Sequence, residues 1–287
     1  MQQPFHTLAI LGGGLLGGSI ALAAQSLMPS PAVRLWARRQ ETVSHAKESG
    51  IRETTSDLRE AVAAADLCIL CVPVGVMPTL LQNAIHAGLP DSCIVTDVGS
   101  VKAAPQRDLA PLMADRTGHF IGSHPMAGSE RKGIEAIRPT LLENAACILT
   151  NDAGAPASAT GRLETFWKFL GCRTSWMDAN AHDELVARIS HLPHIIAASA
   201  ARVALHAPEK GAFGGGGLRD TTRIAGGDPS MWAEILTENR TALLAPMRET
   251  LADLTDILAL LEAGDQEAVC QWLAHAKSLR AASPITP

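Results

Sequence analysis

The chain has little that would bind nucleic acid. Its 287 residues include 24 Lys and Arg against 29 Asp and Glu, a formal net charge of −5 at pH 7. No run of Lys and Arg is longer than two residues. Proteins that bind DNA or RNA usually present a basic patch to the phosphates. We therefore expect no nucleic-acid partner.

Long apolar runs are also scarce. The main candidate is residues 8–25, which resemble the core of a signal peptide. No Lys or Arg precedes this stretch, and five of the seven residues from 12 to 18 are glycine. That composition suits a phosphate-binding turn better than a secretory leader or a membrane span. We expect no membrane partner and a cytoplasmic location.

Cysteine is sparse, with six residues at positions 68, 71, 93, 147, 172 and 270. They are scattered and mostly lie in apolar segments, a pattern typical of reduced thiols and not of a disulfide framework. Cys68 and Cys71 form a C-x-x-C, but the segment has the pattern of a strand. A spacing of three on a strand points side chains to opposite faces. We therefore predict no metal site there.

The apolar segment 7–11 predicts a strand, and it is followed by Gly12, Gly14 and Gly17 in G-x-G-x-x-G spacing, then by a helical stretch and a second strand from residue 32. This context is the one that a dinucleotide-binding turn requires. Gly12 permits the tight turn, Gly14 lets the backbone approach a pyrophosphate, and Gly17 allows close helix–strand packing. The free N–H groups at the helix start favour phosphate.

The end of the second strand bears on cofactor choice. NAD sites usually carry an acidic residue there, whereas this chain has Ala37 followed by Arg38 and Arg39. A guanidinium can bind a 2′-phosphate through two hydrogen bonds, which favours NADP, with NAD as the alternative. Both arginines could instead be solvated side chains before a helix. The residues predicted to contact the cofactor are Gly12, Gly14, Leu15, Leu16, Gly17, Arg38, Arg39, Val72 and Pro73.

Strand and helix patterns alternate as far as residue 178, which predicts an α/β domain with a Rossmann-type doubly wound sheet over residues 1–178. Ser100 and His124 each follow an apolar strand, so we expect both at the carboxyl edge of the sheet, where ligands bind. The alternatives are a helix N-cap for Ser100 and a loop histidine in "GSHPMAGSE" for His124.

From residue 179 to 287 the pattern is helical, which predicts an all-α C-terminal domain. Pro193 interrupts the first helix, and we expect a kink there. His191 and His194 flank it, and a zinc site is the weaker alternative. A glycine-rich connector carries Arg219, Asp220 and Arg223 and is shaped to hold side chains against a ligand. Leu and Met recur at 3-4 spacing from 244 to 261, and we interpret this seam as a helical bundle or dimer contact.

Four blocks together, "VTDVGSVK", "GSHPMAGSE", "ISHLPHIIA" and "LRDTTRIAGGDPSMW", resemble the prephenate/arogenate (cyclohexadienyl) dehydrogenases of tyrosine biosynthesis. The resemblance implies NAD(P)-dependent oxidative decarboxylation to 4-hydroxyphenylpyruvate or tyrosine, and a homodimer joined through the helical domain. It implies that His124 is the base and that Ser100 helps to place it. His194 and Arg223 would bind substrate, with weaker roles for Glu130, Asp220 and Trp232.

Two alternatives remain open at this point. A β-hydroxyacid dehydrogenase also joins a Rossmann domain to helices, but it needs a catalytic lysine in a pattern that this chain lacks after residue 150. A non-enzymatic NADP-sensing protein would not need His124, Ser100 and Arg223 together. We expect the catalytic core alone, with no fused mutase or regulatory segment. The choice between prephenate and arogenate is not resolved by the residues.

Overall fold

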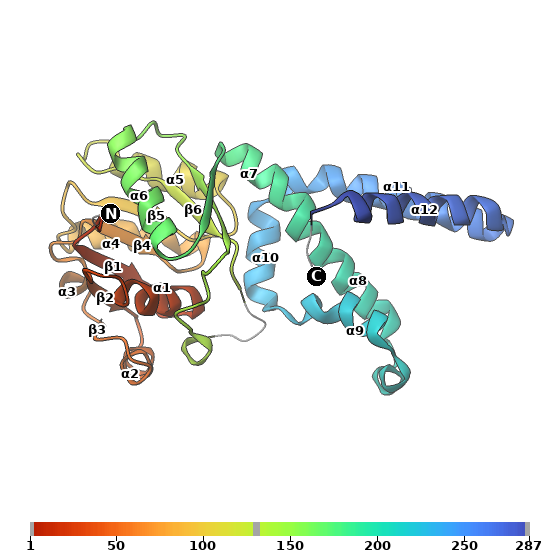
Figure 1. Cartoon of the computed structure of the whole chain (residues 1–287), viewed down its shortest axis with the longest axis horizontal. Coiled ribbons are helices and arrows are strands. Elements are labelled where there is room, and N and C mark those ends of the chain that lie inside the picture. The colour runs from red at the N-terminus through yellow and green to blue at the C-terminus, as the bar shows by residue number, and fades with distance from the viewer. Residues whose placement is uncertain (1–2, 129–132, 285–287) are drawn as a thin grey trace. The chain divides into compact units, whose positions relative to one another are not determined.

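A computed structural model describes residues 3–128 and 133–284 (Figure 1). The chain forms two compact units, residues 1–239 and 240–287. The first unit holds all strands of the described residues and the helices up to residue 238. The second unit consists of two helices. The boundary between 178 and 179 that the sequence suggests stays a prediction.

The main sheet has five parallel strands in the order β3-β2-β1-β4-β5. This order places the first strand in the centre, as in a dinucleotide-binding sheet, and confirms the predicted doubly wound α/β class. The short edge strand β3 was not predicted, because its three polar residues carry no apolar run. The strands are β1 (Thr7–Leu11), β2 (Ala32–Trp36), β3 (Glu53–Thr55), β4 (Leu67–Leu70) and β5 (Ile94–Asp97).

Helices cover both faces of this sheet, which is why its central strands are apolar throughout. Successive residues of β1 enter two different cores, with Leu8 and Ile10 in one and Ala9 and Leu11 in the other. Cys68 and Cys71 likewise pack against opposite cores, as their spacing predicted. The helices of this part are α1 (Leu15–Gln25), α2 (Gln40–Glu48), α3 (Leu58–Val62), α4 (Met77–His86), α5 (Ala103–Met113) and α6 (Ala157–Phe169).

A smaller sheet continues beyond β5 and contains β6 (Gly122–Pro125), β7 (Ala146–Thr150) and β8 (Arg173–Trp176). β6 pairs antiparallel with β7, and β7 pairs parallel with β8. A parallel bridge between Val95 and Phe120 joins the chain before β6 to β5. His124 therefore lies within a strand, opposite Ile148, and not in the loop after one. The sequence misplaced it because glycine, serine and proline are weak strand formers.

The segment from 179 to 204 is a continuous helix with a π-turn, made of α7 (Ala179–Val186), the turn Ala187–His191 and α8 (Leu192–Ala204). Pro193 explains the turn: it has no N–H for the carbonyl four residues earlier, and its ring crowds that carbonyl. A widened turn lies where the sequence predicts a kink. α9 (Gly216–Thr222) and α10 (Pro229–Glu238) follow, and short 3-10 turns lie at Val74–Val76, Ile134–Ala136, Pro208–Phe213 and Arg223–Gly226.

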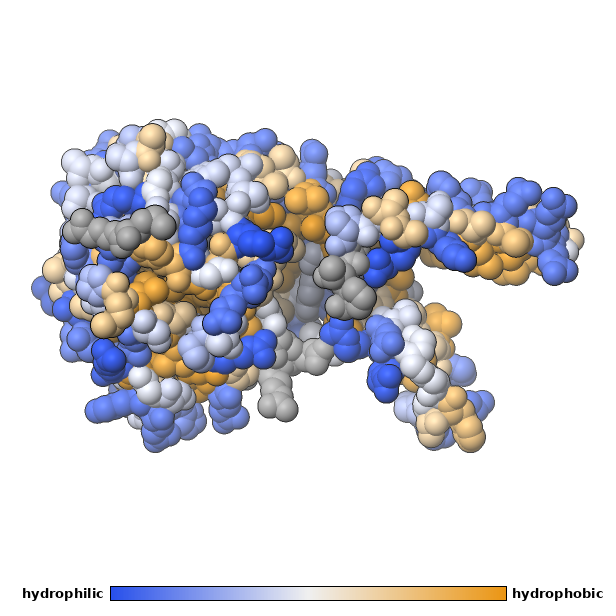
Figure 2. Space-filling view, in the orientation of Figure 1, coloured by the Kyte–Doolittle hydropathy of each residue, from blue (hydrophilic) through white to orange (hydrophobic). Residues whose placement is uncertain are grey.

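The second unit is a hairpin of α11 (Arg240–Ala263) and α12 (Gln266–Ala282), turned at Gly264, whose φ is +66°. The Trp272 indole N–H donates to Asp253 across the hairpin, 3.0 Å away. Apolar side chains gather along both helices in Figure 2. At least half of the side-chain surface is exposed for most of the leucine seam, namely Leu244, Leu251, Leu258 and Leu261. A two-helix hairpin has too little core to bury that seam by itself.

Candidate active site

The glycine motif makes the turn that the sequence predicted. Gly12 has φ +132°, and an added Cβ would lie 2.2 Å from the Cys71 carbonyl oxygen. A Cβ at Gly17 would lie 1.9 Å from the Gly12 carbonyl oxygen. Both glycines are therefore needed for the backbone itself. Gly14 differs, because nothing lies within 4 Å of its added Cβ. The open space above Gly14, at the start of α1, is where a ligand would approach the backbone.

A cleft of about 620 Å³ opens above this turn. Gly12, Gly14, Val72 and Pro73 line it, as do Arg38 and Arg39. Leu15 begins α1, and Leu16 packs partly against the core under the sheet, so neither lines the cleft. The remaining lining comes from Gly13, Trp36, Ala37, Glu41, Thr42, His45, Cys71, Val76, Leu80, Gly133, Ile134 and Glu135.

The Arg38 and Arg39 side chains are exposed at the rim of this cleft. Ala37 is buried, and its N–H donates to the Thr55 carbonyl, so no acidic side chain occupies the usual NAD position. Glu41 on α2 brings one carboxylate to the same rim. Together, Arg38, Arg39 and Glu41 therefore give the rim an excess of positive charge.

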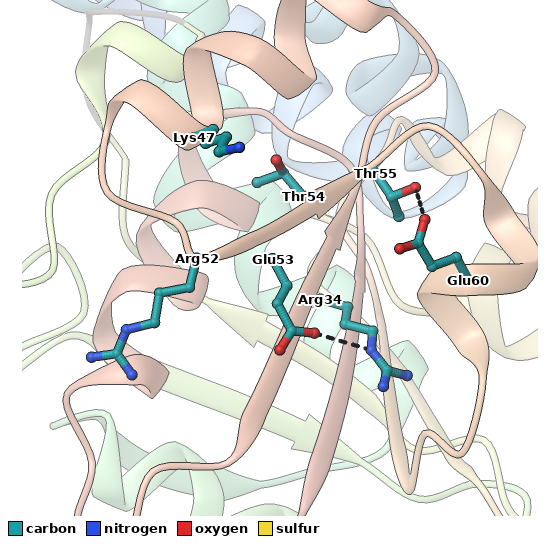
Figure 3. A pocket seen from close by; sticks show the side chains of 7 residues that line it. All are labelled: Arg34, Lys47, Arg52, Glu53, Thr54, Thr55 and Glu60. Atoms are coloured by element: carbon teal, nitrogen blue, oxygen red, sulfur yellow. Dashed lines mark hydrogen bonds and ion pairs between the residues drawn. The ribbon is translucent and has the colours of Figure 1, made fainter.

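A second, smaller cavity of about 290 Å³ lies at the edge strand β3 (Figure 3). Its charged and polar groups largely pair with one another. Arg34 Nε lies 3.2 Å from Glu53 Oε2, and Thr55 Oγ1 donates to Glu60 Oε2 at 2.5 Å. Figure 3 shows the Glu53 and Glu60 carboxylates turned toward these partners. We assign no chemistry to this cavity.

His124 is 7% exposed, on strand β6. Its neighbour Ser123 points to the other side and is fixed there by Thr96 Oγ1 at 2.7 Å and by the Trp167 indole N–H at 2.9 Å. Because side chains alternate along a strand, anchoring Ser123 sets the direction of His124. The Trp167 ring is fully buried, so this anchor is rigid.

Two residues from α7 complete the surroundings of His124. His124 Nδ1 lies 2.8 Å from His182 Nε2, and His182 Nδ1 lies 2.8 Å from Asp183 Oδ1. The Asp183 carboxylate also accepts the backbone N–H of Lys102 at 2.7 Å and of Ala103 at 3.0 Å. It thereby satisfies free N–H groups at the start of α5. Lys102, and not Ser100, is the N-cap residue of that helix.

Burial lowers the pKa of His124 well below its usual value, and the proximity of His182, Lys102 and His191 lowers it further. A second imidazole or an ammonium group disfavours the imidazolium form. The pKa of His182 is also lowered, chiefly by burial, although its bond to Asp183 opposes the shift. Both histidines are therefore neutral near pH 7, and a neutral imidazole can accept a proton.

A buried ion pair lies beneath the site. The Lys102 ammonium group bonds the Asp97 carboxylate at the end of β5, and both side chains are fully buried. Asp97 Oδ2 also accepts the Gly99 N–H at 2.8 Å. This pair fixes the loop that carries Ser100 between β5 and α5. Ser100 itself is half-buried in that loop.

The predicted substrate residue His194 is buried on α8, and its ring stacks on Trp232 of α10. His191 meets the edge of the same indole, at 6.2 Å between centroids. His194 Nδ1 and His191 Nε2 are buried and have no hydrogen-bond partner among the described residues. Burial lowers the pKa of both, to about 4 for His191. Unsatisfied ring nitrogens of this kind are costly, which marks this end of the site for a polar ligand.

Asn239 links the two ends of the site. Its side-chain amide lies 3.0 Å from His191 Nδ1 and donates to the Asp183 carbonyl at 2.8 Å. The contacts thus run without a break from Trp232 through His191 and Asn239 to the pair that holds His124. His182, Asp183 and Asn239 were not predicted. The adjacent His and Asp of "AHDEL" were the only signal for the first two.

The other predicted residues are less constrained. Arg223 begins a 3-10 turn that packs against α8, and its side chain is exposed. Asp220 is exposed on α9 and lies 3.5 Å from the neighbouring Arg219. Glu130 lies outside the described residues. Within residues 3–128 and 133–284, no group of three His, Cys, Asp or Glu side chains is placed to hold a metal ion. No helix in that part is long and apolar enough to cross a membrane.

A dinucleotide-binding sheet joined to a helical site with a buried neutral histidine defines a nicotinamide-dependent dehydrogenase class. Two family models match the chain: the prephenate dehydrogenase nucleotide-binding domain over residues 20–175 and the prephenate dehydrogenase dimerization domain over residues 178–275. The chain therefore belongs to the prephenate dehydrogenase family, as the four blocks of sequence predicted.

Individual relatives agree with this. The chain is 31% identical to the cyclohexadienyl dehydrogenase of Zymomonas mobilis over 97% of its length and 96% of the relative. It is 32% identical to the prephenate dehydrogenase of Bacillus subtilis, over 99% of this chain and 78% of that one. Aquifex aeolicus prephenate dehydrogenase, solved with hydroxyphenyl propionate and NAD+, superposes with a TM-score of 0.87 at 27% identity, covering 96% and 97% of the two chains.

A 3-hydroxyisobutyrate dehydrogenase from Mycobacterium tuberculosis superposes with a TM-score of 0.53 at 18% identity, over 79% of this chain and 72% of that one. This likeness shows the shared fold alone. This neighbour represents the β-hydroxyacid dehydrogenase class, which is the alternative that the sequence left open. The matches to the two prephenate dehydrogenase family models decide against that class. The cofactor is accordingly a nicotinamide dinucleotide.

Proposed function

We propose that this chain oxidatively decarboxylates prephenate, arogenate or both, yielding 4-hydroxyphenylpyruvate or tyrosine, with His124 as the base. The observation that carries the proposal is a buried, neutral imidazole fixed on a strand beside the dinucleotide-binding sheet. The residues around the glycine turn fit a dinucleotide, since the space above Gly14 is open and the α1 N–H groups face it. A nicotinamide dinucleotide held there would supply the acceptor for the hydride that leaves substrate C4.

The role of His124 follows from the substrate. A C4 hydroxyl gives up hydride poorly while it keeps its proton, and His124 accepts that proton as the C4–H bond breaks. The C4–O bond becomes a carbonyl. The electron pair of the C1–carboxylate bond then moves into the ring, CO₂ leaves, and the ring becomes an aromatic phenolate, which takes back the proton from His124 to give the phenol. Ser100, in the loop fixed by the Lys102–Asp97 pair, hydrogen-bonds the same hydroxyl region and helps to place His124.

The other predicted residues bind the substrate. A substrate with two carboxylates needs cationic partners, and Arg223 can bind a carboxylate through two parallel hydrogen bonds. His194 offers a ring nitrogen at the same end, and Trp232 forms the flat wall behind it. Asp220 has a weaker, supporting role at the site, as has Glu130, which lies outside the described residues.

We propose that NADP is preferred over NAD. The support is the pair of arginines at the cleft rim and the alanine where an acidic residue would reject a 2′-phosphate. The test compares kcat/KM for NADP and NAD in Arg38→Ala, Arg39→Ala and the parent chain. Loss of a charged hydrogen bond costs about 1.5–3 kcal/mol, so we expect the NADP:NAD ratio to fall about tenfold or more. An unchanged ratio in both variants would contradict the preference.

We further propose a homodimer formed through the helical part from residue 179 onward. The exposed leucines of α11 and α12 support it, since an apolar stripe of this length seldom stays in water. Light scattering should give about twice the 30.2 kDa chain mass. A cytoplasmic location is supported by six cysteines that form no disulfide.

The decisive experiment supplies prephenate or arogenate with NADP or NAD and follows both reduced cofactor and released CO₂. Turnover with either substrate, with the two products in equal amounts, is the expected result. A folded protein that binds the cofactor but turns over neither substrate would eliminate the proposed reaction. That result would favour a sensing role instead.

A further inference from the structure

His182 and Asp183 have no place in the proposed chemistry, yet both are joined by hydrogen bonds to the surroundings of His124. They stand next to each other in the middle of α7 and are buried, at 0% and 5% exposure. His182 contacts His124 on one side and Asp183 on the other. We propose that His182 and Asp183 are positioning residues that fix the tautomer of His124, so that Nε2 is the nitrogen without a proton.

Asp183 determines the direction of the hydrogen bonds that join it to His182 and His124. Its Oδ1 accepts the Lys102 N–H, and its Oδ2 accepts the Ala103 N–H. Both oxygens are thus committed as acceptors, and an ionised carboxylate has no proton to donate. The hydrogen bond between Asp183 Oδ1 and His182 Nδ1 must then take its proton from the imidazole. His182 therefore carries its proton on Nδ1.

The direction of the hydrogen bond between His182 and His124 is determined in the same way. The pKa of His182 is lowered by burial, so the ring is neutral near pH 7 and holds one N–H only. With that proton on Nδ1, its Nε2 is an acceptor. The 2.8 Å contact then requires His124 to donate from Nδ1. His124 is neutral as well, and its Nε2 is left as the basic nitrogen.

The same hydrogen bonds stabilise His124 after proton transfer. When His124 takes a proton on Nε2 it becomes an imidazolium, and the Nδ1–H still donates to His182. The Asp183 carboxylate then lies one imidazole away and offsets the new charge. The titratable groups that face these hydrogen bonds are Lys102 and Asp97 from the β5–α5 side and the neutral His191 from the π-turn. Lys102 opposes the imidazolium, which makes the carboxylate of Asp183 more important.

The first test reads the tautomers directly, without substrate. Long-range ¹H–¹⁵N spectra of the full chain labelled with ¹⁵N-histidine distinguish Nδ1–H from Nε2–H rings, and His124→Asn and His182→Gln assign the signals. We expect both rings as Nδ1–H. Asp183→Ala removes the acceptor of the His182 Nδ1–H. A buried N–H without a partner is costly, so both rings should shift toward Nε2–H. An Nε2–H ring at His124 in the parent chain would overturn the proposal.

The second test measures rates and rests on the proposed function. Asp183→Ala should lower kcat about 10²–10⁴-fold, because the His124 tautomer with a free Nε2 is no longer favoured. The matched control Asp108→Ala removes a partly exposed carboxylate from α5 and should leave kcat unchanged. His182→Gln keeps an amide oxygen that accepts from His124 and should lose less than His182→Leu. In a His124→Asn background, Asp183→Ala should lower kcat almost no further, since Asp183 acts through His124.

The outcomes separate the two proposals. Altered tautomers in Asp183→Ala without turnover of either substrate in the parent chain would retain the positioning role and reject the proposed reaction. Turnover with an unchanged kcat in Asp183→Ala would retain the reaction and reject the positioning role. If the losses from His124→Asn and Asp183→Ala add up in the double variant, the carboxylate acts by holding α5, and the proposal fails. Thermal unfolding of each variant identifies a general loss of structure.

Discussion

The Trp232 indole lies flat on the His194 imidazole, with 3.6 Å between ring centroids and 10° between ring planes. Gly227 packs against this stack, and its added Cβ would lie 2.4 Å from Trp232 Nε1 and 3.2 Å from His194 Cε1. Gly227→Ala should therefore displace the stack at a cost of about 1–3 kcal/mol. We expect KM for the substrate to rise about tenfold while cofactor affinity is unchanged, measured by steady-state kinetics and cofactor titration.

The neighbouring glycine supplies the control for this substitution. Nothing lies within 4 Å of an added Cβ at Gly226, so Gly226→Ala makes the same chemical change without contact. Its KM should match that of the parent chain. Equal effects of the two substitutions would mean that loop flexibility, and not the stacked pair, sets substrate affinity.

The assignment of His124 as the base predicts a defect confined to the chemical step. His124→Asn should lower kcat about 10²–10⁴-fold, because general base catalysis contributes a factor of that size. Cofactor affinity should not change. His86→Asn, on the exposed end of α4, is the matched control and should retain full activity. A large fall in cofactor affinity in His124→Asn would show that the residue serves binding instead.

The glycine turn predicts opposite outcomes at two positions. Gly17→Ala places a Cβ 1.9 Å from the Gly12 carbonyl oxygen and should lower the unfolding midpoint by several degrees. Gly14→Ala meets no atom within 4 Å and should fold as the parent does, with weaker cofactor binding. Thermal unfolding with and without cofactor separates the two. Normal cofactor affinity in Gly14→Ala would place the pyrophosphate elsewhere.

The buried histidines predict a loss of stability in mild acid. Burial lowers the folded-state pKa of His124, His182, His191 and His194, whereas in the unfolded chain each should titrate near its usual pKa of about 6.5. Below that pH the unfolded chain binds more protons, so the free energy of unfolding decreases as pH falls. The loss begins near pH 6.5 and extends toward the pKa of about 4 for His191.

Urea unfolding at fixed protein concentration, between pH 7.5 and pH 5, measures this dependence. His191→Gln removes one of the titrating groups and should reduce the slope. A free energy of unfolding that stays constant or increases toward pH 5 would show that these rings become protonated in the folded chain.

Local patterns in the sequence predicted much of the fold. Apolar runs located β1, β4 and β5, and glycine spacing located the turn that follows β1. Each of these features is encoded within a dozen consecutive residues. The strand before His124 was expected too early in the sequence, because β6 is stabilised by pairing with β7 and its own residues carry little strand preference. Arg38 and Arg39 were placed at the cleft because they follow directly from the end of a strand.

The surroundings of His124 could not be predicted in the same way. His182 is 58 residues from His124 in sequence, and only the packing of α7 against α5 brings them together. The sequence offered Ser100, close to the start of α5, as the cap of that helix. Asp183 on α7 instead accepts the N–H groups at the start of α5. Contacts of this kind depend on the relative placement of elements, which one sequence does not encode in a readable pattern.

The π-turn before Pro193 has a consequence for how such chains vary. An α-helix advances about 100° per residue, so one extra residue in the turn changes the phase of everything after it by about that angle. Residues before the turn hold His124, and His194 after it meets Trp232. A substitution between 187 and 190 preserves that phase, whereas deletion of one residue would rotate His194 away from its indole. Related chains should therefore tolerate replacements in this stretch more readily than a single-residue gap.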